Sequence, residues 1–249
     1  MKAHRVRRIG WLMLASGAVL LLSTYIVLLV VCREPRLQGR PTTSWVRDLS
    51  RAGDGRHEAA VRLFRAEGAN AVPGLVSVLD RRRSAFAAWL KRLPFHDSMP
   101  GRIKDWVGER TAMQDLDRAW AVRMCSLIGS RGRGAQKSLQ RALVDGSPFV
   151  RGAAARALAD TQADPAIAIP LIAAALSDPD AGVRSQAAIA FGVYRQSALP
   201  MLAKLESLTK DPDHRVEFSA RLAVAMIETP DRVTSITNDN GEVSYRLQR

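Results

Sequence analysis

The sequence predicts an all-α fold, an α-solenoid of stacked helix pairs, because its C-terminal half repeats every 33 residues. Two residue types recur at this step: Val150, Val183 and Val216, and Asp145, Asp178 and Asp211. Behind each valine, alanine, leucine or phenylalanine follows at helical spacing. A fixed period of this length is typical of supersecondary units that bury their apolar faces only against one another.

Composition limits the functional classes. Hydrophobic residues make up 47% of the 249 residues and aromatics only 6%, which suits closely packed helices. The net charge is +13, and seven basic residues against one acid lie in the first 40 positions. The surplus of positive charge in the rest of the chain favours acidic partners or anionic surfaces. It is too widely spread for a dedicated nucleic-acid surface. Two cysteines exclude a disulfide framework.

The N-terminal region predicts a membrane anchor. A basic tail, residues 1–9, precedes an uncharged apolar run, residues 10–32. About 22 helical residues span roughly 33 Å, enough to cross a bilayer. We interpret the run as an uncleaved signal anchor with an extracytoplasmic soluble domain, although basic residues on both flanks determine the orientation weakly. Cleavage before a lipidated Cys32 is the alternative. Residues 33–42 are interpreted as a linker.

Residues 43–227 are expected to form the solenoid, as about four helix pairs and a terminal helix. Two pairs are expected at 148–177 and 181–209, and the last helix at about 214–227. Residues 81–117 interrupt the period and are interpreted as an insertion with one or two short helices. The tail, residues 228–249, alternates around Asn240-Gly241, which predicts a β-hairpin.

The best-preserved units read Asp-x-x-x-x-Val-Arg-x-x-Ala-Ala-x-Ala-Leu, followed by a loop and a second apolar helix that includes a proline, as from Asp145 through Pro170. This pattern resembles the HEAT repeat, in the short form of phycobilisome-lyase-type HEAT-like proteins. The resemblance covers roughly residues 56–227, apart from 81–117. It implies a helical scaffold and, as an alternative, a bilin lyase-like enzyme or its chaperone subunit.

The repeated charges predict a structural ladder. Its members are Asp145, Arg151, Asp178 and Arg184, because arginines at one repeat position line up in a stack. We expect them to bind these aspartates or carbonyls of adjacent units. Asp180 and Asp213 stand where helix N-caps are needed. Cys125 shares its repeat position with Leu158 and Phe191, which predicts a buried, inert thiol.

The insertion carries the candidate partner-binding residues: Arg81, Arg82, Arg83, Trp89, Arg92, Phe95 and Trp106. Arginine and tryptophan are frequent in interface hot spots. The competing interpretation is that the aromatics pack on the solenoid and the arginines are solvated. The four histidines are scattered, and no nucleophile, acid–base pair, metal site or cofactor motif stands out.

The sequence therefore predicts a membrane-anchored scaffold that binds an unknown protein partner, without catalysis or cofactor. Solenoids expose long surfaces that suit this function. Two alternatives stay open, the bilin lyase-like protein and a nucleic-acid-binding solenoid. A bilin-dependent change in absorbance would favour the first, and a strongly salt-dependent affinity for DNA the second.

Overall fold

The computed structural model describes residues 34–51, 55–81, 101–237 and 243–248. The chain divides into two units, Met1–Pro35 and Arg36–Arg249, and the second is described here. None of the helices in these described ranges is both long and apolar enough to cross a membrane. The span predicted at residues 10–32 lies outside them.

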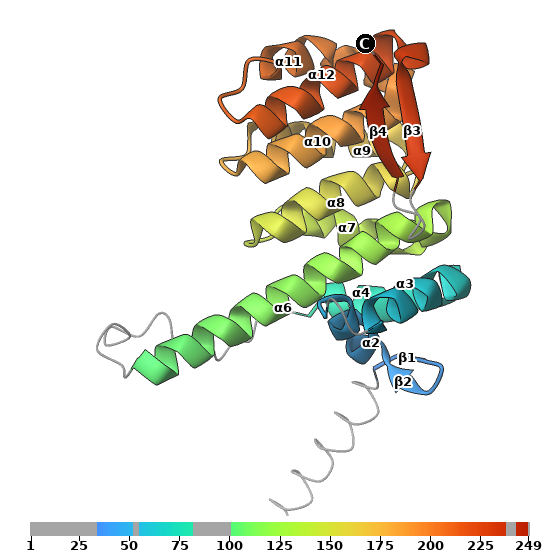
Figure 1. Ribbon diagram of the computed structural model, residues 1–249, viewed down its shortest axis with the longest axis vertical. Helices are drawn as coiled ribbons and strands as arrows, with labels where there is room; N and C mark the ends of the chain where they lie inside the picture. Colours follow the sequence, from blue (N-terminus) through green and yellow to red (C-terminus); the bar gives the residue numbers. More distant parts are fainter. Residues whose placement is uncertain (1–33, 52–54, 82–100, 238–242, 249) are drawn as a thin grey trace, which may run out of the picture. The chain divides into compact units, whose positions relative to one another are not determined.

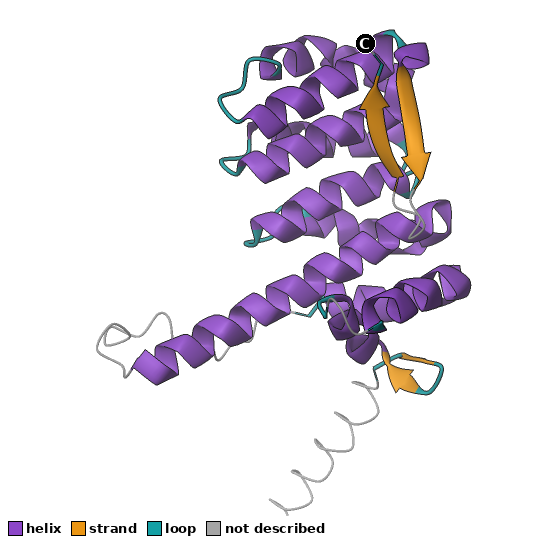
Figure 2. Ribbon diagram, in the orientation of Figure 1, coloured by secondary structure: helices purple, strands orange, loops and turns teal. Residues whose placement is uncertain are grey.

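The second unit is a stack of helix pairs followed by a single helix (Figures 1 and 2). The pairs are α3 (Arg56–Glu67) with α4 (Val72–Leu79), α6 (Gly101–Ile128) with α7 (Gln136–Ala142), α8 (Pro148–Asp160) with α9 (Pro165–Ala173), and α10 (Ala181–Tyr194) with α11 (Leu202–Leu208). The stack continues with α12 (His214–Glu228). Four 3-10 segments connect or extend these helices: η1 (Gly68–Ala71), η3 (Gly129–Ala135), η4 (Ala174–Ser177) and η5 (Arg195–Met201). For these residues the predicted all-α solenoid is confirmed.

The first helix of each unit packs on the first helix of the next, from α6 through α8 and α10 to α12. Val150, Val183 and Val216 occupy equivalent places on the last three, and each is at most 1% exposed. A Cβ added to Gly152 on α8 would lie 3.4 Å from Val183 Cα on α10. Small residues at this interface thus allow the helices to approach closely.

Side-chain caps mark the starts of three helices. The Asp180 carboxylate accepts a hydrogen bond from Val183 N at 3.1 Å, and Asp213 accepts one from Arg215 N at 2.9 Å. Asp164 caps α9 in the same way. These carboxylates bind free N–H groups at the positive end of the helix dipole. The N-caps predicted at Asp180 and Asp213 are confirmed.

A residue with positive φ recurs after the first helices. Gly129, Gln162 and Arg195 lie 33 residues apart and have φ values of 64°, 53° and 51°. Glycine adopts a positive φ without strain, whereas it costs glutamine and arginine about 1–3 kcal/mol each. The turn is therefore imposed by the stack in the two later units.

Helix α6 corrects the predicted insertion at 81–117. Residues 101–117 form no separate short helix but continue without a break into the first helix of the second unit. No proline interrupts this segment after Pro100, so the helix extends N-terminally beyond the repeat. Figure 1 shows α6 projecting past the first helices that follow it. Residues 82–100 lie outside the described ranges.

The predicted linker, residues 33–42, is also partly ordered. Strands β1 (Arg36–Leu37) and β2 (Arg40–Pro41) form a small antiparallel hairpin before α2 (Thr42–Leu49). Leu37 is buried, and its carbonyl accepts a hydrogen bond from Trp45 Nε1 at 3.1 Å. The Arg40 guanidinium lies 4.0 Å from the centre of the Trp45 ring. The indole thus fixes the hairpin to α2, which packs on α3, α4 and α6.

A second hairpin follows α12 and η6 (Pro230–Arg232), as the tail sequence predicts. Strands β3 (Val233–Thr237) and β4 (Val243–Leu247) pair antiparallel, with Val233 opposite Leu247. Both strands contact α12. The Tyr245 ring lies 5.4 Å from the Arg156 guanidinium, which places β4 over the first helices. The Asn240-Gly241 turn is outside the described residues.

An arginine–aspartate ladder joins successive units. Arg118, Arg151 and Arg184 each bind the aspartate 27 residues later, which belongs to the following loop: Asp145, Asp178 and Asp211. Arg151 donates to both Asp178 oxygens at 2.8 Å and to the Asp145 carbonyl at 2.9 Å. Glu217 replaces the arginine in α12 and pairs with Arg221 instead. The ladder thus connects each loop to the next.

The ladder predicts a loss of stability in acid. The hydrogen bonds from Arg151 and Arg184 lower the pKa of Asp178 and of Asp211 in the folded protein. Groups with a lowered folded-state pKa stabilise fully above the unfolded pKa of about 3.9, and lose this contribution as pH falls through the folded value. Urea unfolding should therefore show a falling free energy below about pH 4. Replacing both aspartates with asparagine should make that fall shallower, and an unchanged slope would contradict the assignment.

Candidate functional site

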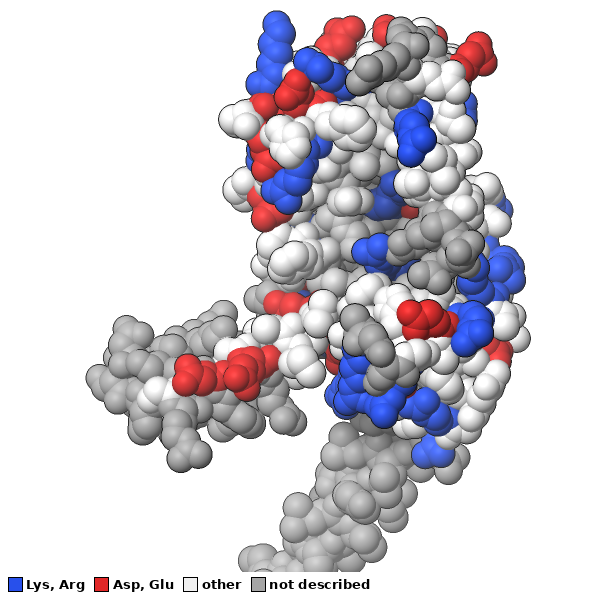
Figure 3. Space-filling model, in the orientation of Figure 1, with Lys and Arg blue, Asp and Glu red and all other residues white. Residues whose placement is uncertain are grey.

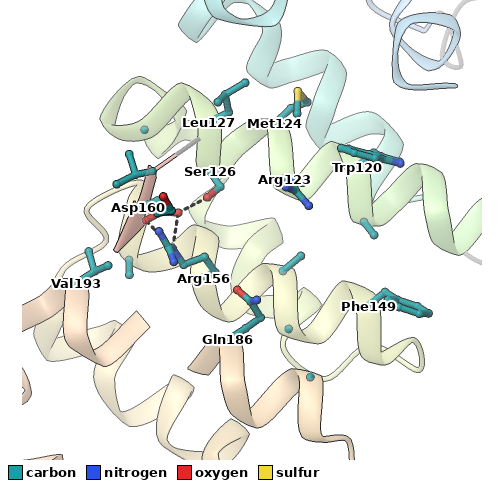
Figure 4. A pocket seen from close by; sticks show the side chains of 18 of the residues that line it. Trp120, Arg123, Met124, Ser126, Leu127, Phe149, Arg156, Asp160, Gln186 and Val193 are labelled. Carbon is teal, nitrogen blue, oxygen red and sulfur yellow. Dashed lines mark hydrogen bonds and ion pairs between the residues drawn. The ribbon is translucent and has the colours of Figure 1, made fainter. Parts of the chain in front are cut away.

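A groove of about 990 Å³ opens on the first-helix face of the stack (Figure 4). We call it the first-helix groove. Helix α6 lines it with Leu116, Trp120, Arg123 and Leu127. Helix α8 lines it with Phe149, Ala153, Arg156 and Asp160. Helix α10, His57 of α3, Arg215 of α12 and the start of β4 also line it.

The repeat produces this surface. Residues spaced four, three and four apart lie on one face of a helix. Each lining residue of α8 follows its counterpart on α6 by 33 positions, and Gly182, Gln186 and Val193 continue three of these rows on α10. Because the first helices stack side by side, equivalent faces form one continuous floor.

A polar cluster lies on this floor beside the hairpin. Arg156 Nε donates to the two Asp160 oxygens at 3.0 and 2.9 Å, and Ser126 Oγ donates to the same carboxylate. Figure 4 shows these three side chains converging between α6 and α8. Burial raises the pKa of Tyr245, whose ring lies against Arg156. Asp160 therefore balances the charge of Arg156, and the contact between Arg156 and Tyr245 holds β4 against α8.

Apolar and aromatic side chains lie at the open end of the groove. Phe149 is 77% exposed, and Leu116, one repeat earlier, is 41% exposed. The Trp120 ring meets His57 edge-on at 5.5 Å, and the Arg123 guanidinium lies 5.3 Å from its centre. An aromatic surface held in place by its neighbours is typical of an interface anchor.

Positive charge is in excess around the groove. Its charged lining residues are three arginines and two aspartates: Arg123, Arg156, Arg215, Asp160 and Asp180. Exposed Arg131, Arg133 and Arg195 follow the C-terminal ends of α6 and α10, where helix dipoles favour cations. Figure 3 shows basic residues dominating the lower right of this face, whereas both signs mix at the loops on the left.

Most of the partner-binding residues predicted in the insertion are not placed by the structure. Arg82, Arg83, Trp89, Arg92 and Phe95 lie outside the described ranges. Trp106 lies in α6, but its side chain is outside the description.

Arg81 is exposed and lies near Asp117. Burial raises the pKa of Asp117, while Arg47 and Arg81 oppose that shift. The proposed role of the insertion therefore stays a prediction.

The groove residues were not singled out from the sequence. Leu116 and Phe149 are apolar and occupy one repeat position. This position lies outside the core-facing side of the helix, which Val150 marks. Comparing repeat positions outside the core would have revealed this exposed apolar row. Trp120 alone carries no such signal, because a single tryptophan on a helix is more often part of the core.

Two further sequence predictions concern chemistry. Within the residues that the structure describes, no group of histidine, cysteine, aspartate and glutamate could hold a metal ion. Cys125 is 1% exposed, and burial raises the pKa of its thiol to about 12. The predicted burial of Cys125 is confirmed, and because the thiolate is the reactive form, the raised pKa is consistent with the inert thiol that the sequence predicts.

Comparison with known proteins identifies the repeat. Residues 109–192 match the sequence profile of HEAT repeats, from within α6 into α10. The matched segment is about a third of the chain and contains most of the first-helix groove. No curated protein matches the chain. The match and the stacked helix pairs together support a HEAT-repeat protein.

Proposed function

We propose that this HEAT-repeat protein is a single-pass, membrane-anchored scaffold that binds a protein partner in the first-helix groove. HEAT repeats generally mediate protein–protein interactions. A solenoid buries its core between neighbouring units and leaves an extended face free, which favours binding without catalytic residues.

The observation that carries the proposal is the aromatic end of the groove. Phe149 is 77% exposed and lines the same groove as Trp120, and this groove of about 990 Å³ extends across three first helices. Exposed apolar residues grouped beside a concavity mark interaction sites, whereas scattered ones do not. Arginine and tryptophan next to them are the residue types that contribute most to binding energy.

The sequence supports the membrane anchor and its orientation. The uncharged run at 10–32 has the length of a bilayer span, and four basic residues precede it. We propose that the repeats lie on the extracytoplasmic side.

Alkaline carbonate extraction should leave the full chain in the membrane fraction. A phosphatase fused to the C-terminus should be active, and activity of a fluorescent cytoplasmic reporter instead would reverse the orientation.

Site-specific crosslinking tests the binding surface. A photoreactive phenylalanine analogue replaces Phe149 in the groove or, as a control, Lys137, an exposed residue of α7. Irradiation of intact membranes followed by mass spectrometry should identify one partner through position 149 and not through position 137. The purified partner should then bind the purified chain. Equal crosslinking at both positions, or no direct binding, would refute the groove as the docking site.

The two alternatives from the sequence stay predictions. A bilin lyase-like activity predicts a changed absorbance spectrum after co-expression with bilin and a phycobiliprotein. Nucleic-acid binding predicts salt-dependent affinity for duplex DNA. The binding would occur near the exposed Arg131.

A further inference from the structure

We infer that the first-helix groove takes an extended, acidic peptide segment of the partner, which adds as a third strand to the open edge of β4. This inference rests on the proposed function, because it specifies the partner's chemistry at the same groove. Strand addition obtains affinity from main-chain hydrogen bonds and specificity from the side chains of alternate residues.

The open edge borders the groove directly. Strand β4 pairs with β3 on one side, and none of the other described strands pairs with it. Val243 and Ser244 of β4 line the groove, whereas no residue of β3 does. Strand β4, rather than β3, therefore borders the groove. An open strand edge next to a concave surface is a template for another extended chain.

The hairpin contacts the helices of the stack at two places. Its strands contact α12 at one end. Farther along the stack, the Tyr245 ring lies 5.4 Å from the Arg156 guanidinium, which Asp160 fixes in turn. Isolated two-stranded hairpins are marginal in water, so these contacts with the helices provide the support that strand addition needs.

The helices beneath provide a floor for alternate side chains. A strand added to β4 lies about 4.8 Å from it, above the first helices. The floor there is formed by small or partly buried residues: Ala153, Gln186 and Val193. Every second side chain of the peptide points toward this floor, so aliphatic residues suit those positions. The part of the groove lined by Phe149 and Trp120 accommodates a larger side chain of the peptide as an anchor.

Charge complementarity selects an acidic peptide. Arginines outnumber aspartates in the lining, and Asp160 is already bound by Arg156. Arg215 is bound by Asp213 at 2.9 Å. The attraction for an acidic peptide therefore comes from Arg123, which is exposed at the groove, and from Arg195, which is exposed near Tyr245. Glutamate or aspartate at the outward positions of the peptide meets these guanidinium groups. A basic peptide meets repulsion instead.

The test uses the full chain in a mild detergent and a fluorescein-labelled probe of about ten alternating glutamates and valines, which exceeds the length of β4. Fluorescence anisotropy should show saturable binding. Hydrogen–deuterium exchange of residues 243–247 should slow when the probe binds, because the open edge gains hydrogen bonds. A matched probe with lysine in place of glutamate should bind at least roughly tenfold more weakly.

Two charge reversals provide matched controls. Arg123→Glu in the groove should weaken probe binding about tenfold, and Lys137→Glu on α7 should change it less than about twofold.

Binding without slower exchange in β4 would overturn strand addition, and equal binding of the lysine probe would overturn the acidic class. Tighter binding of a labelled duplex of about 20 base pairs, displacing the peptide, would assign the groove to nucleic acid. If a partner crosslinks at position 149 but hydrogen–deuterium exchange in β4 does not slow, strand addition is wrong and the proposed function still stands.

Discussion

Replacing Arg151 with leucine is expected to lower the free energy of unfolding by about 3 kcal/mol. The guanidinium donates to both oxygens of Asp178 and to the Asp145 carbonyl, and both side chains of the pair are less than a fifth exposed. The variant leaves the Asp178 carboxylate partly buried without this partner. That desolvation cost, more than the lost attraction, makes the effect large.

The matched control is Arg221→Leu. Arg221 pairs with Glu217 on α12, but its side chain is 62% exposed, so its loss should cost less than about 0.5 kcal/mol. Urea unfolding of the full chain in detergent, followed by circular dichroism, measures both. The double variant Arg151→Leu/Asp178→Leu should recover part of the loss, because it removes the stranded charge. Equal effects of the two single variants would refute a structural role for the ladder.

The ladder shows how far the sequence could predict this structure. A 33-residue step places Arg151 and Arg184 at one position and Asp145 and Asp178 at another. The repeat alone could not decide whether each arginine binds the aspartate of its own unit or of the next. Long side chains reach either way, and the pairing depends on how adjacent loops stack. In the structure the aspartate of the following loop is bound.

Other features depended on packing that local sequence does not encode. Gly129 signals a helix end, but Gln162 and Arg195 adopt a positive φ at the same repeat position with no such signal. Helix α6 continues through residues 101–117 because nothing in that segment stops it, although the repeat begins later. The groove combines faces of separate helices with β4, so only the three-dimensional stack brings its residues together.

Replacing Phe191 with alanine is expected to destabilise the protein by about 4 kcal/mol, the largest effect we predict for a single side chain. Phe191 is fully buried at the repeat position that Leu158 and Cys125 occupy in earlier units. The cost of a large-to-small substitution depends on how far the surroundings can collapse into the cavity. Next to Phe191, a Cβ on Gly192 would already lie 3.1 Å from Ala223 Cα, so α10 and α12 cannot approach further.

Phe218→Ala is the matched control, because Phe218 lies on α12 but is 56% exposed. It should change the free energy of unfolding by less than about 0.5 kcal/mol, as surface substitutions usually do. Both variants are measured by urea unfolding at neutral pH. Because units of a solenoid are stabilised mainly by their neighbours, the Phe191 cavity should also loosen the α10–α12 end. Hydrogen exchange in α12 should then quicken more than in α3, and uniform exchange along the stack would show that the array unfolds as one unit.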